Sequence, residues 1–449
     1  MIFSSWSFLL YFLPVAIALF KFSQRSGHLG MVQSSLLLAS CVFYASWSVP
    51  YLLLLLTSIT VNWYFGGKLQ SNKKRSLLFA AVLVNLTPLL FYKYSGWLTG
   101  YSTLTNLILP LGISFYTFQQ IGYLVDCYRG KTIRDSYLGY ACFVSFFPQL
   151  IAGPIVSHKK MHAIYSNLHQ HYFDWSQTAL GIHLFVAGLI KKVVIADNIA
   201  PVANKLFSYP DTASFADAWL GTFAYTFQLY FDFSGYCEMA MGAALLFGVA
   251  LPINFNSPYK ARSITEFWRR WHITLGAFFK DYIYIPLGGN RHGFVRTLAL
   301  LALIAFISGV WHGAGSTFVL WGVMHGVALV AHRLWSGFDV QMPTAIATLL
   351  CFIFVSLSWV MFRAETVHDA LTLYGLMLLP DIATLSNHNL LASSYWWAVM
   401  GLSVVVFFFP NIHETGVPVE RQKILQTATA LFITLITLGH SNEFLYFQF

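Results

Sequence analysis

The chain has 449 residues, of which 57% are hydrophobic and 10% charged, and its formal net charge is +9 at pH 7. This composition leaves too few polar side chains to cover a water-soluble protein, so it predicts an all-α integral membrane protein. The basic residues lie in short segments between apolar runs, which is typical of topology signals and anionic-lipid contacts. We therefore expect the lipid bilayer, and no nucleic acid, as a partner.

Apolar windows long enough to cross about 30 Å of hydrocarbon begin at the N-terminus. The first window, 2–20, lacks a basic n-region and a small-residue cleavage site, so we expect a membrane helix rather than a cleaved signal peptide. The others are 31–48, 51–66, 77–92, 104–124, 138–156, 178–196, 215–250, 297–311, 315–335, 345–362, 394–410 and 424–439. The window 215–250 is long enough for two passes with a break at FDFSGY, and we expect 10 to 13 helices in all.

Two features predict segments that do not simply cross the bilayer. Lysine pairs at 159–160 and 191–192 bracket a single apolar window on both sides, which blurs the topology signal and indicates a re-entrant segment. The motif SFFPQLIAGP carries Pro148 and Pro154 inside an apolar window. Irregular backbone at membrane depth is tolerated only inside protein or along a water-filled cavity, so we expect this motif to line an interior space. Ordinary kinks packed against neighbouring helices are the alternative.

A charged and aromatic segment lies between residues 260 and 296, with seven basic and two acidic residues. On a helix Glu266 would face Arg269 and Arg270, and the aromatic side chains would form a broad apolar surface. Such a segment is expected in the membrane interface, with its cations toward water or phosphate, and headgroup anchoring explains most of it. Arg269, Arg270 and Arg291 are candidates to bind the phosphates of a nucleotide thioester or of carrier-bound pantetheine.

His312 follows an apolar run and has Trp311, a candidate donor- or substrate-binding residue, before it and Gly313 after it. An ionisable side chain at membrane depth costs about 2.5 kcal/mol or more if it is charged and unpaired, which indicates a role other than folding. A neutral imidazole, with an ordinary pKa of about 6.5, can accept a hydroxyl proton as a general base in acyl transfer to an alcohol. His325 and His332 follow on one helical face, and we interpret them as packing or hydrogen-bonding residues.

Two acids, Asp232 and Glu238, lie in the apolar motif YFDFSGYCEMAMG. They are candidates for an ion pathway in a transporter or for structuring a substrate tunnel, and the residues alone leave both interpretations open. There is no DxD pair and no HExxH motif, which disfavours a metal-dependent glycosyl transferase and a zinc protease.

We expect no metal site. The spacing of His158 and His162, with His169 and His171, is like that of metal ligands, but no neighbouring carboxylate or cysteine completes a set. The five cysteines are scattered without a CxxC pair, so they predict neither a disulfide framework nor a zinc finger.

Five motifs carry a family resemblance. They are VDCYRGK (125–131), SFFPQLIAGPI (145–155), YFDFSGYCEMAMG (230–242), EFWRRWHITLGAFFKDYIYIPLGGNR (266–291) and SGVWHGAGSTFVLWGVMHG (308–326). Together they resemble the membrane-bound O-acyltransferase family, and in particular its bacterial branch of alginate O-acetyltransferases and D-alanyl and peptidoglycan acyltransferases. The chain departs from many relatives at Cys237 and Glu238, where those have Ser-Asp.

The resemblance implies that His312 is the principal catalytic histidine and that His272 is the second functional position. It implies one polytopic domain with a central funnel, in which residues 110–335 form the core and 1–109 and 336–449 supply flanking helices. It also implies a bacterial inner-membrane location, an acyl-coenzyme A or acyl-carrier-protein thioester as donor substrate, and no bound cofactor. The implied partner is a periplasmic or membrane-tethered protein of the SGNH-hydrolase-like type, with a polysaccharide as acceptor.

The leading hypothesis is thus an O-acetyltransferase that moves an acetyl group from a cytoplasmic thioester to an extracellular polysaccharide such as alginate. A proton-coupled transporter or lipid flippase, using Asp232, Glu238 and the histidines as a relay, is the alternative from another class. A structural subunit whose activity resides in a partner is a third possibility.

Overall fold

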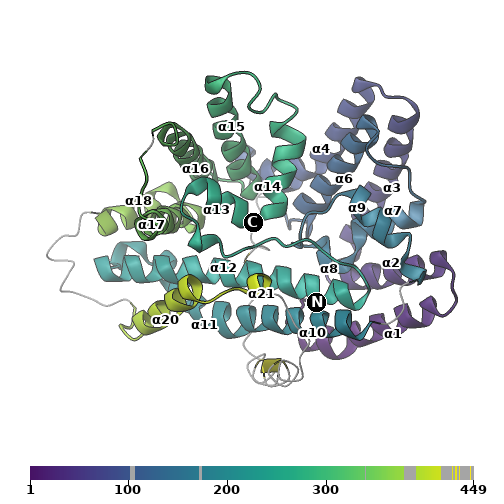
Figure 1. Ribbon diagram of the computed structural model, residues 1–449, viewed down its shortest axis with the longest axis horizontal. Coiled ribbons are helices and arrows are strands. Elements are labelled where there is room, and N and C mark those ends of the chain that lie inside the picture. The colour runs from purple at the N-terminus through teal and green to yellow at the C-terminus, as the bar shows by residue number, and fades with distance from the viewer. Residues whose placement is uncertain are drawn as a thin grey trace. The chain divides into compact units, whose positions relative to one another are not determined.

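The computed structural model describes residues 1–101, 107–170, 174–338, 340–378 and 391–415, together with positions 427, 430, 431, 434 and 445 (Figure 1). These residues form helices, turns and loops, and no β-strand occurs among them. The predicted all-α fold class is confirmed for this part of the chain.

The chain forms two compact units, each discontinuous in sequence. Unit 1 comprises Met1–Ile190, Gly235–Pro252 and Pro418–Glu443, and unit 2 comprises Lys191–Ser234, Ile253–Val417 and Phe444–Phe449. The subdivision into 1–109, 110–335 and 336–449 stays a prediction.

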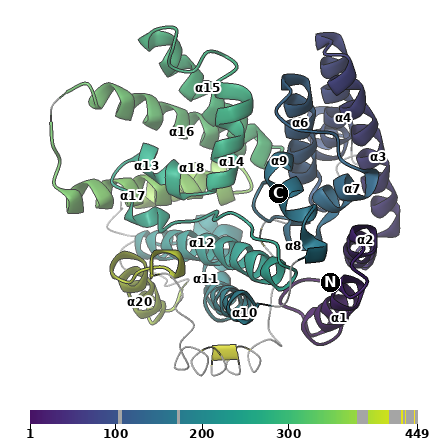
Figure 2. The ribbon, with the colours of Figure 1, turned by 45° about the vertical axis from the view of Figure 1, so that its right-hand side comes forward.

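Unit 1 contains the N-terminal helices. They are η1 (Ser7–Phe12), α1 (Leu13–Gln24), α2 (Leu29–Ala45), α3 (Val49–Ser71), α4 (Arg75–Thr99), α6 (Ile113–Arg129), α7 (Tyr137–Ser145), α8 (Phe147–Leu150), α9 (His158–Tyr165), η2 (Leu168–Gln170) and α10 (Trp175–Leu189). In both views α3, α4 and α6 lie side by side (Figures 1 and 2).

Unit 2 contains most of the later helices. They are η3 (Ile190–Ala196), α11 (Asp197–Ser208), η4 (Pro210–Thr212), η5 (Pro258–Lys260), α13 (Ile264–Arg270), α14 (Ile273–Phe279), η6 (Lys280–Tyr284), α15 (Phe294–His312), α16 (Ser316–Trp335), α17 (Thr344–Arg363), α18 (Val367–Leu378), α20 (Tyr395–Phe408) and α21 (Ile412–Thr415). Helix α12 (Phe215–Leu246) begins in unit 2 and ends in unit 1.

Eight helical segments in the described residues are long and apolar enough to span a membrane. They are Ser7–Gln24, Val49–Ser71, Arg75–Thr99, Trp175–Ser208, Phe294–His312, Ser316–Trp335, Thr344–Arg363 and Tyr395–Glu414. A further apolar helix, Leu29–Ala45, is shorter. These segments identify a multi-pass membrane protein. The sequence predicted 10 to 13 helices, which is more than these eight. One of the predicted windows, 424–439, lies almost wholly outside the described residues.

The predicted break at FDFSGY is wrong, because α12 runs without interruption through it. The polar side chains that suggested a break are buried, and Asp232 is paired with Lys192 inside unit 2. Because Lys192 compensates the charge of Asp232, the helix can continue through the motif without a break that exposes its backbone to water.

The segment around Pro148 is irregular and buried. Helix α7 ends at Ser145, α8 spans four residues, and the residues from Tyr140 to Val156 are all buried within unit 1. Surrounding protein therefore shields this backbone from lipid. Ordinary kinks packed against neighbouring helices, the alternative interpretation, would be shielded in the same way.

The segment 260–296 is not the exposed amphipathic surface that its aromatic residues suggested. Phe267 on α13 and Trp271 at the C-terminal end of α13 are each 1% exposed, and Phe278 and Phe279 are buried as well. These side chains pack inside unit 2 because short helices α13 and α14, with a sharp bend between them, turn their apolar faces inward.

Helices α15 and α16 form a closely packed hairpin in unit 2. A Cβ atom on Gly322 would lie 2.8 Å from the backbone oxygen of Ala305, and one on Gly309 would lie 2.7 Å from the Cα of Gly322. Small residues at such crossings allow two backbones to approach, as is common in membrane helix pairs. The hairpin sets the position of His312 at the end of α15.

Candidate active site

His312 is the last residue of α15, and it is 3% exposed. Its imidazole lies among aromatic rings, with centroid distances of 4.8 Å to Trp311, 5.1 Å to Trp321 and 5.2 Å to Phe362. These rings hold the imidazole in one position.

His272 lies close to the same tryptophan. The ring centroid of Trp311 is 6.2 Å from that of His272 and 4.8 Å from that of His312. The two histidines named from the sequence are 40 positions apart, yet the fold of unit 2 brings both close to a single indole group.

The backbone of His272 has a left-handed conformation, with φ 44° and ψ 52°. Only it and Ser257 have positive φ among the described non-glycine residues. Such a conformation costs on the order of 1 kcal/mol or more for an L-residue and is often found at functional sites. Here it produces the bend between α13 and α14, and the side chain is 0% exposed.

Asn254 determines which nitrogen of His272 carries the proton. The Oδ1 atom of Asn254 accepts hydrogen bonds from the backbone N–H of Thr274 at 3.1 Å and from its hydroxyl at 2.9 Å. A backbone N–H can only donate, so this oxygen is an acceptor, and the contact of 3.2 Å from His272 Nδ1 requires a proton on Nδ1. The other nitrogen, Nε2, then carries a lone pair.

Burial lowers the pKa of His272 from 6.5 to about 3. The charged form is disfavoured because the ring has lost its contact with water. His272 is therefore neutral at physiological pH, and it can accept a hydrogen bond through Nε2. Asn254 was not predicted as a site residue, and no local sequence signal marks it.

His325 and His332 make hydrogen bonds, which confirms the interpretation from the sequence. Trp268 Nε1 donates to His325 Nδ1 at 3.2 Å, and His325 Nε2 lies 3.0 Å from the hydroxyl of Ser358. That hydroxyl donates to a backbone oxygen, so it accepts from Nε2–H. His332 Nδ1 lies 2.9 Å from the Thr265 hydroxyl.

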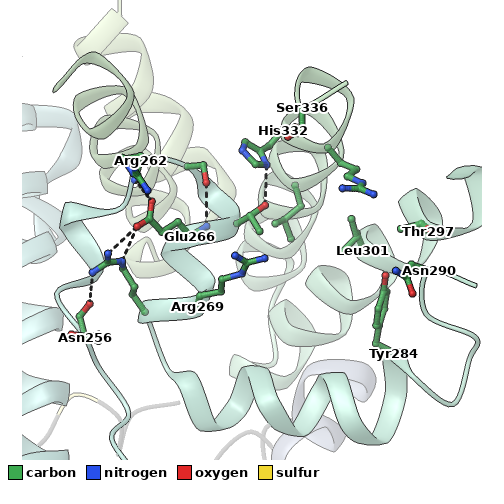
Figure 3. Close-up of a pocket in the computed structure, with 15 residues that line it drawn as sticks. Asn256, Arg262, Glu266, Arg269, Tyr284, Asn290, Thr297, Leu301, His332 and Ser336 are labelled. Carbon is green, nitrogen blue, oxygen red and sulfur yellow. Dashed lines mark hydrogen bonds and ion pairs between the residues drawn. The ribbon is translucent and has the colours of Figure 1, made fainter. Parts of the chain in front are cut away.

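A pocket of about 810 Å³ in unit 2 is lined by four arginines (Figure 3). They are Arg262, Arg269, Arg270 and Arg333, and Glu266 is the acidic residue among them. Two of the predicted phosphate-binding residues, Arg269 and Arg270, thus share one cavity. Arg291 is not among its lining residues, although its neighbour Asn290 is.

Glu266 neutralises two of these arginines. It forms ion pairs with Arg270 at 2.9 Å and with Arg262 at 3.3 Å. Burial alone would raise the pKa of Glu266, but hydrogen bonds from the Arg262 backbone and from both guanidinium groups lower it overall. No ion pair to a carboxylate is found for Arg269 or Arg333 in the described part of the chain, so both remain available for an anion.

Asp232 lies in a buried ion cluster of unit 2. Lys192 Nζ is 2.7 Å from Asp232 Oδ1 and 2.7 Å from Asp197 Oδ1, and the backbone N–H of Leu445 donates to Asp232 Oδ2 at 3.0 Å. Lys192 was interpreted from the sequence only as a topology signal. Glu238, the other predicted acid, is buried in unit 1.

The expectation that no carboxylate accompanies His158 and His162 is wrong. The Oδ2 atom of Asp135 lies 2.8 Å from His162 Nδ1 and 3.5 Å from His158 Nε2. This acid precedes α7 while the histidines lie on α9, so a search of the flanking sequence could not find it. His169 lies outside this cluster, and His171 lies outside the described residues.

Comparisons with known proteins identify the family of this chain. Residues 134–367 match the model of the membrane-bound O-acyltransferase family, and this range includes both His272 and His312. The chain is 45% identical over 378 residues to a peptidoglycan O-acetyltransferase of Helicobacter pylori, covering 75% of this chain and 72% of that protein.

Two further relatives match the chain. A probable alginate O-acetylase of Pseudomonas aeruginosa is 38% identical over 431 residues, covering 91% of this chain and 81% of that protein. A teichoic acid D-alanyltransferase of Streptococcus thermophilus is 27% identical, covering 66% of this chain and 70% of that protein. With its membrane-spanning helices and its buried histidine pair, the chain belongs to the membrane-bound O-acyltransferase family and is an acyltransferase.

Proposed function

We propose that this protein transfers an acetyl group from a thioester to a hydroxyl group of an extracellular polysaccharide. The observation that carries the proposal is the placement of His312 and His272 against one indole ring, in the same unit as a pocket with two uncompensated arginines. A hydroxyl group that receives the acetyl group needs a base to remove its proton. A thioester donor needs a site that binds the phosphate groups of its carrier.

His312 is proposed as the general base. As the acceptor oxygen forms a bond to the thioester carbonyl carbon, the hydroxyl proton moves to the neutral imidazole. The tetrahedral intermediate collapses with cleavage of the carbon–sulfur bond, and the proton passes from the imidazole to the leaving thiolate. The products are an acetyl ester and a thiol, and His312 returns to its neutral form.

His272 is proposed to position the acceptor rather than to stabilise negative charge. Its Nδ1–H is directed to Asn254, so Nε2 carries a lone pair, and a lone pair cannot stabilise an oxyanion. A lone pair at this site would orient a substrate hydroxyl or N–H group. Correct orientation of reacting groups is worth orders of magnitude in rate.

The donor is proposed to be acetyl-coenzyme A or an acetylated carrier protein. Both carry phosphate on the pantetheine arm, and guanidinium groups suit phosphate because they donate several hydrogen bonds in a plane. Arg269 and Arg333 are the proposed phosphate contacts, since Glu266 compensates Arg262 and Arg270.

The acceptor class follows from the names of the relatives. The Helicobacter pylori relative is named for peptidoglycan and the Pseudomonas aeruginosa relative for alginate, and both are carbohydrate polymers. We propose a polysaccharide acceptor outside a bacterial inner membrane, and an SGNH-hydrolase-like partner at the membrane surface. A transporter or flippase is not favoured, because the named relatives are acyltransferases.

Reconstituted transfer tests the proposal. Proteoliposomes with the full chain and its partner protein would receive radiolabelled acetyl-coenzyme A, and label on the polysaccharide would be measured. We expect His312→Gln to reduce the initial rate by about 100-fold or more. The matched control is His28→Gln, since His28 is exposed in unit 1 and should leave the rate unchanged.

Two results would refute the assignment. The first is a wild-type rate in a folded His312→Gln protein, with folding checked by its unfolding temperature. The second is uptake of substrate into the proteoliposomes without release of any thiol, which would favour the transporter.

A further inference from the structure

We propose that Asp135, His158 and His162 form a binding site for a divalent transition-metal ion, with Zn²⁺ as the best-fitting class. This site lies in unit 1 and is independent of the proposed acyl transfer. One carboxylate oxygen and two imidazole nitrogens are the ligand atoms that zinc and its neighbours accept in proteins.

The ligand atoms already lie close together. One potential ligand atom from each residue lies within 4.8 Å of the other two. Ligands at bond lengths of about 2.0–2.2 Å around a tetrahedral ion are separated by roughly 3.3–3.6 Å. The separation of 3.5 Å between His158 Nε2 and Asp135 Oδ2 matches this value, and no hydrogen bond joins these two atoms.

His158 is the strongest indication of a ligand. It is 1% exposed and packs against the rings of Tyr123 at 4.7 Å and Phe143 at 5.1 Å, yet its Nε2 atom has no hydrogen-bond partner and faces a carboxylate. Buried polar atoms without a partner are rare, and each is costly. A cation between Nε2 and the carboxylate oxygen would give this nitrogen a partner.

The other nitrogen of His158 is held as in metal-bound histidines. Its Nδ1 atom lies 2.7 Å from the hydroxyl oxygen of Thr132, a residue that is itself buried. Metal ligands of this type almost always use the second ring nitrogen in a hydrogen bond that fixes the orientation of the ring. Thr132 would therefore keep the lone pair of Nε2 directed at the site.

The carboxylate of Asp135 is also preoriented. Its Oδ1 atom accepts a hydrogen bond from the Ser136 N–H at 2.8 Å, and it lies where a Cβ on Gly139 would be only 2.5 Å away. The absence of a side chain at Gly139 thus provides the space for this carboxylate. The remaining oxygen, Oδ2, is directed at the two histidines.

The distance between one pair of ligand atoms must increase when the ion binds. His162 Nδ1 and Asp135 Oδ2 are 2.8 Å apart, which is a hydrogen-bond length. The side chain of His162 is 25% exposed, so it can move outward by the required fraction of an ångström. The ion would displace the proton between these atoms and connect the loop before α7 to the start of α9.

Zinc binding by the untagged full-length protein tests the proposal. The protein would be stripped with a chelator in detergent and titrated with Zn²⁺ against a fluorescent chelator of known affinity. We expect one tight site per chain, and a loss of affinity of about tenfold or more in Asp135→Asn and His162→Asn. Both residues are partly exposed, so these variants should fold. The matched control is His28→Asn, an exposed histidine of the same unit, with unchanged affinity.

A second readout uses Co²⁺, whose visible absorption reports its ligands. We expect a spectrum with the wild-type protein that is lost in Asp135→Asn, and a Zn²⁺-dependent rise of the unfolding temperature in the wild type alone. The proposal is overturned if the wild-type protein binds no Zn²⁺ above the level of the Asp135→Asn protein. It is also overturned if His28→Asn weakens binding as much as His162→Asn does.

Discussion

Lys192 and Asp232 form a buried ion pair in unit 2, with 2.7 Å between Nζ and Oδ1 and side chains that are 4% and 2% exposed. The same ammonium group contacts Asp197 at 2.7 Å. A single cation thus compensates two carboxylates, and one of these belongs to the motif from which a helix break was predicted.

Replacement of Lys192 should destabilise the protein strongly. Lys192→Met leaves two carboxylates buried without their cation, and breaking a buried pair in this way costs about 3–5 kcal/mol. We expect a marked fall in the unfolding temperature in detergent. Lys205→Met is the control, because Lys205 is exposed on α11 and its loss should change stability by about 0.5 kcal/mol or less. Equal unfolding temperatures of the two variants would contradict this account.

His272→Gly should separate the backbone role of His272 from its chemical role. Glycine adopts the left-handed conformation without strain, so the bend between α13 and α14 is retained while the imidazole is lost. We expect kcat for acetyl transfer to fall by about 100-fold, with a smaller change of KM for the donor. A glycine variant with wild-type kcat would show that only the bend matters.

His272 should also make stability depend on pH. Its folded pKa of about 3 lies below the ordinary value of 6.5, so between these values the unfolded chain binds a proton that the folded protein does not. The contribution of His272 to the free energy of unfolding is therefore full above pH 6.5 and is lost as the pH falls toward 3. This free energy changes by at most about 1.4 kcal/mol per pH unit.

Unfolding measured from pH 7 to pH 4 checks this contribution. His272→Asn should show a shallower loss of stability than the wild type, because asparagine does not titrate and tolerates a left-handed backbone. Parallel curves for the two proteins would rule out the proposed pKa shift.

Arg269→Gln should weaken donor binding. The guanidinium group lines the pocket and is not compensated by Glu266, so its loss removes an attraction for phosphate (Figure 3). We expect KM for acetyl-coenzyme A to rise by about tenfold with little change of kcat, and the effect to shrink at high salt. Arg75→Gln, at the start of α4 in unit 1, provides the control. A change confined to kcat would place Arg269 outside the donor site.

Gly322→Ala should loosen the α15–α16 hairpin. The new Cβ would lie 2.8 Å from the backbone oxygen of Ala305, and a backbone atom cannot move aside easily. We expect a loss of about 1–3 kcal/mol in stability. In the matched variant, Gly401→Ala on α20, the new Cβ meets nothing within 4 Å, so that change should be neutral or stabilising. The reverse order of stabilities would contradict the packing model.

Composition and motifs determined much about this protein. High apolar content with few charges leaves a bundle of membrane helices as the stable solution, and the run before His312 marked an ionisable group in an apolar setting. His272 was named as the second functional position only through the family resemblance of the motif around it. Boundaries of regular spans such as Thr344–Arg363 also followed closely, because hydropathy over 20 residues reports burial or lipid contact directly.

Only the tertiary structure decided which distant groups meet. The partners of the predicted residues, Asn254 for His272 and Lys192 for Asp232, lie on other elements and have no local signal. Asp135 completes the set of His158 and His162 from across α7 for the same reason. Hydropathy records whether a side chain avoids water, but hydrogen bonds, ion pairs and ligand sets depend on contacts that form only when separate helices pack together.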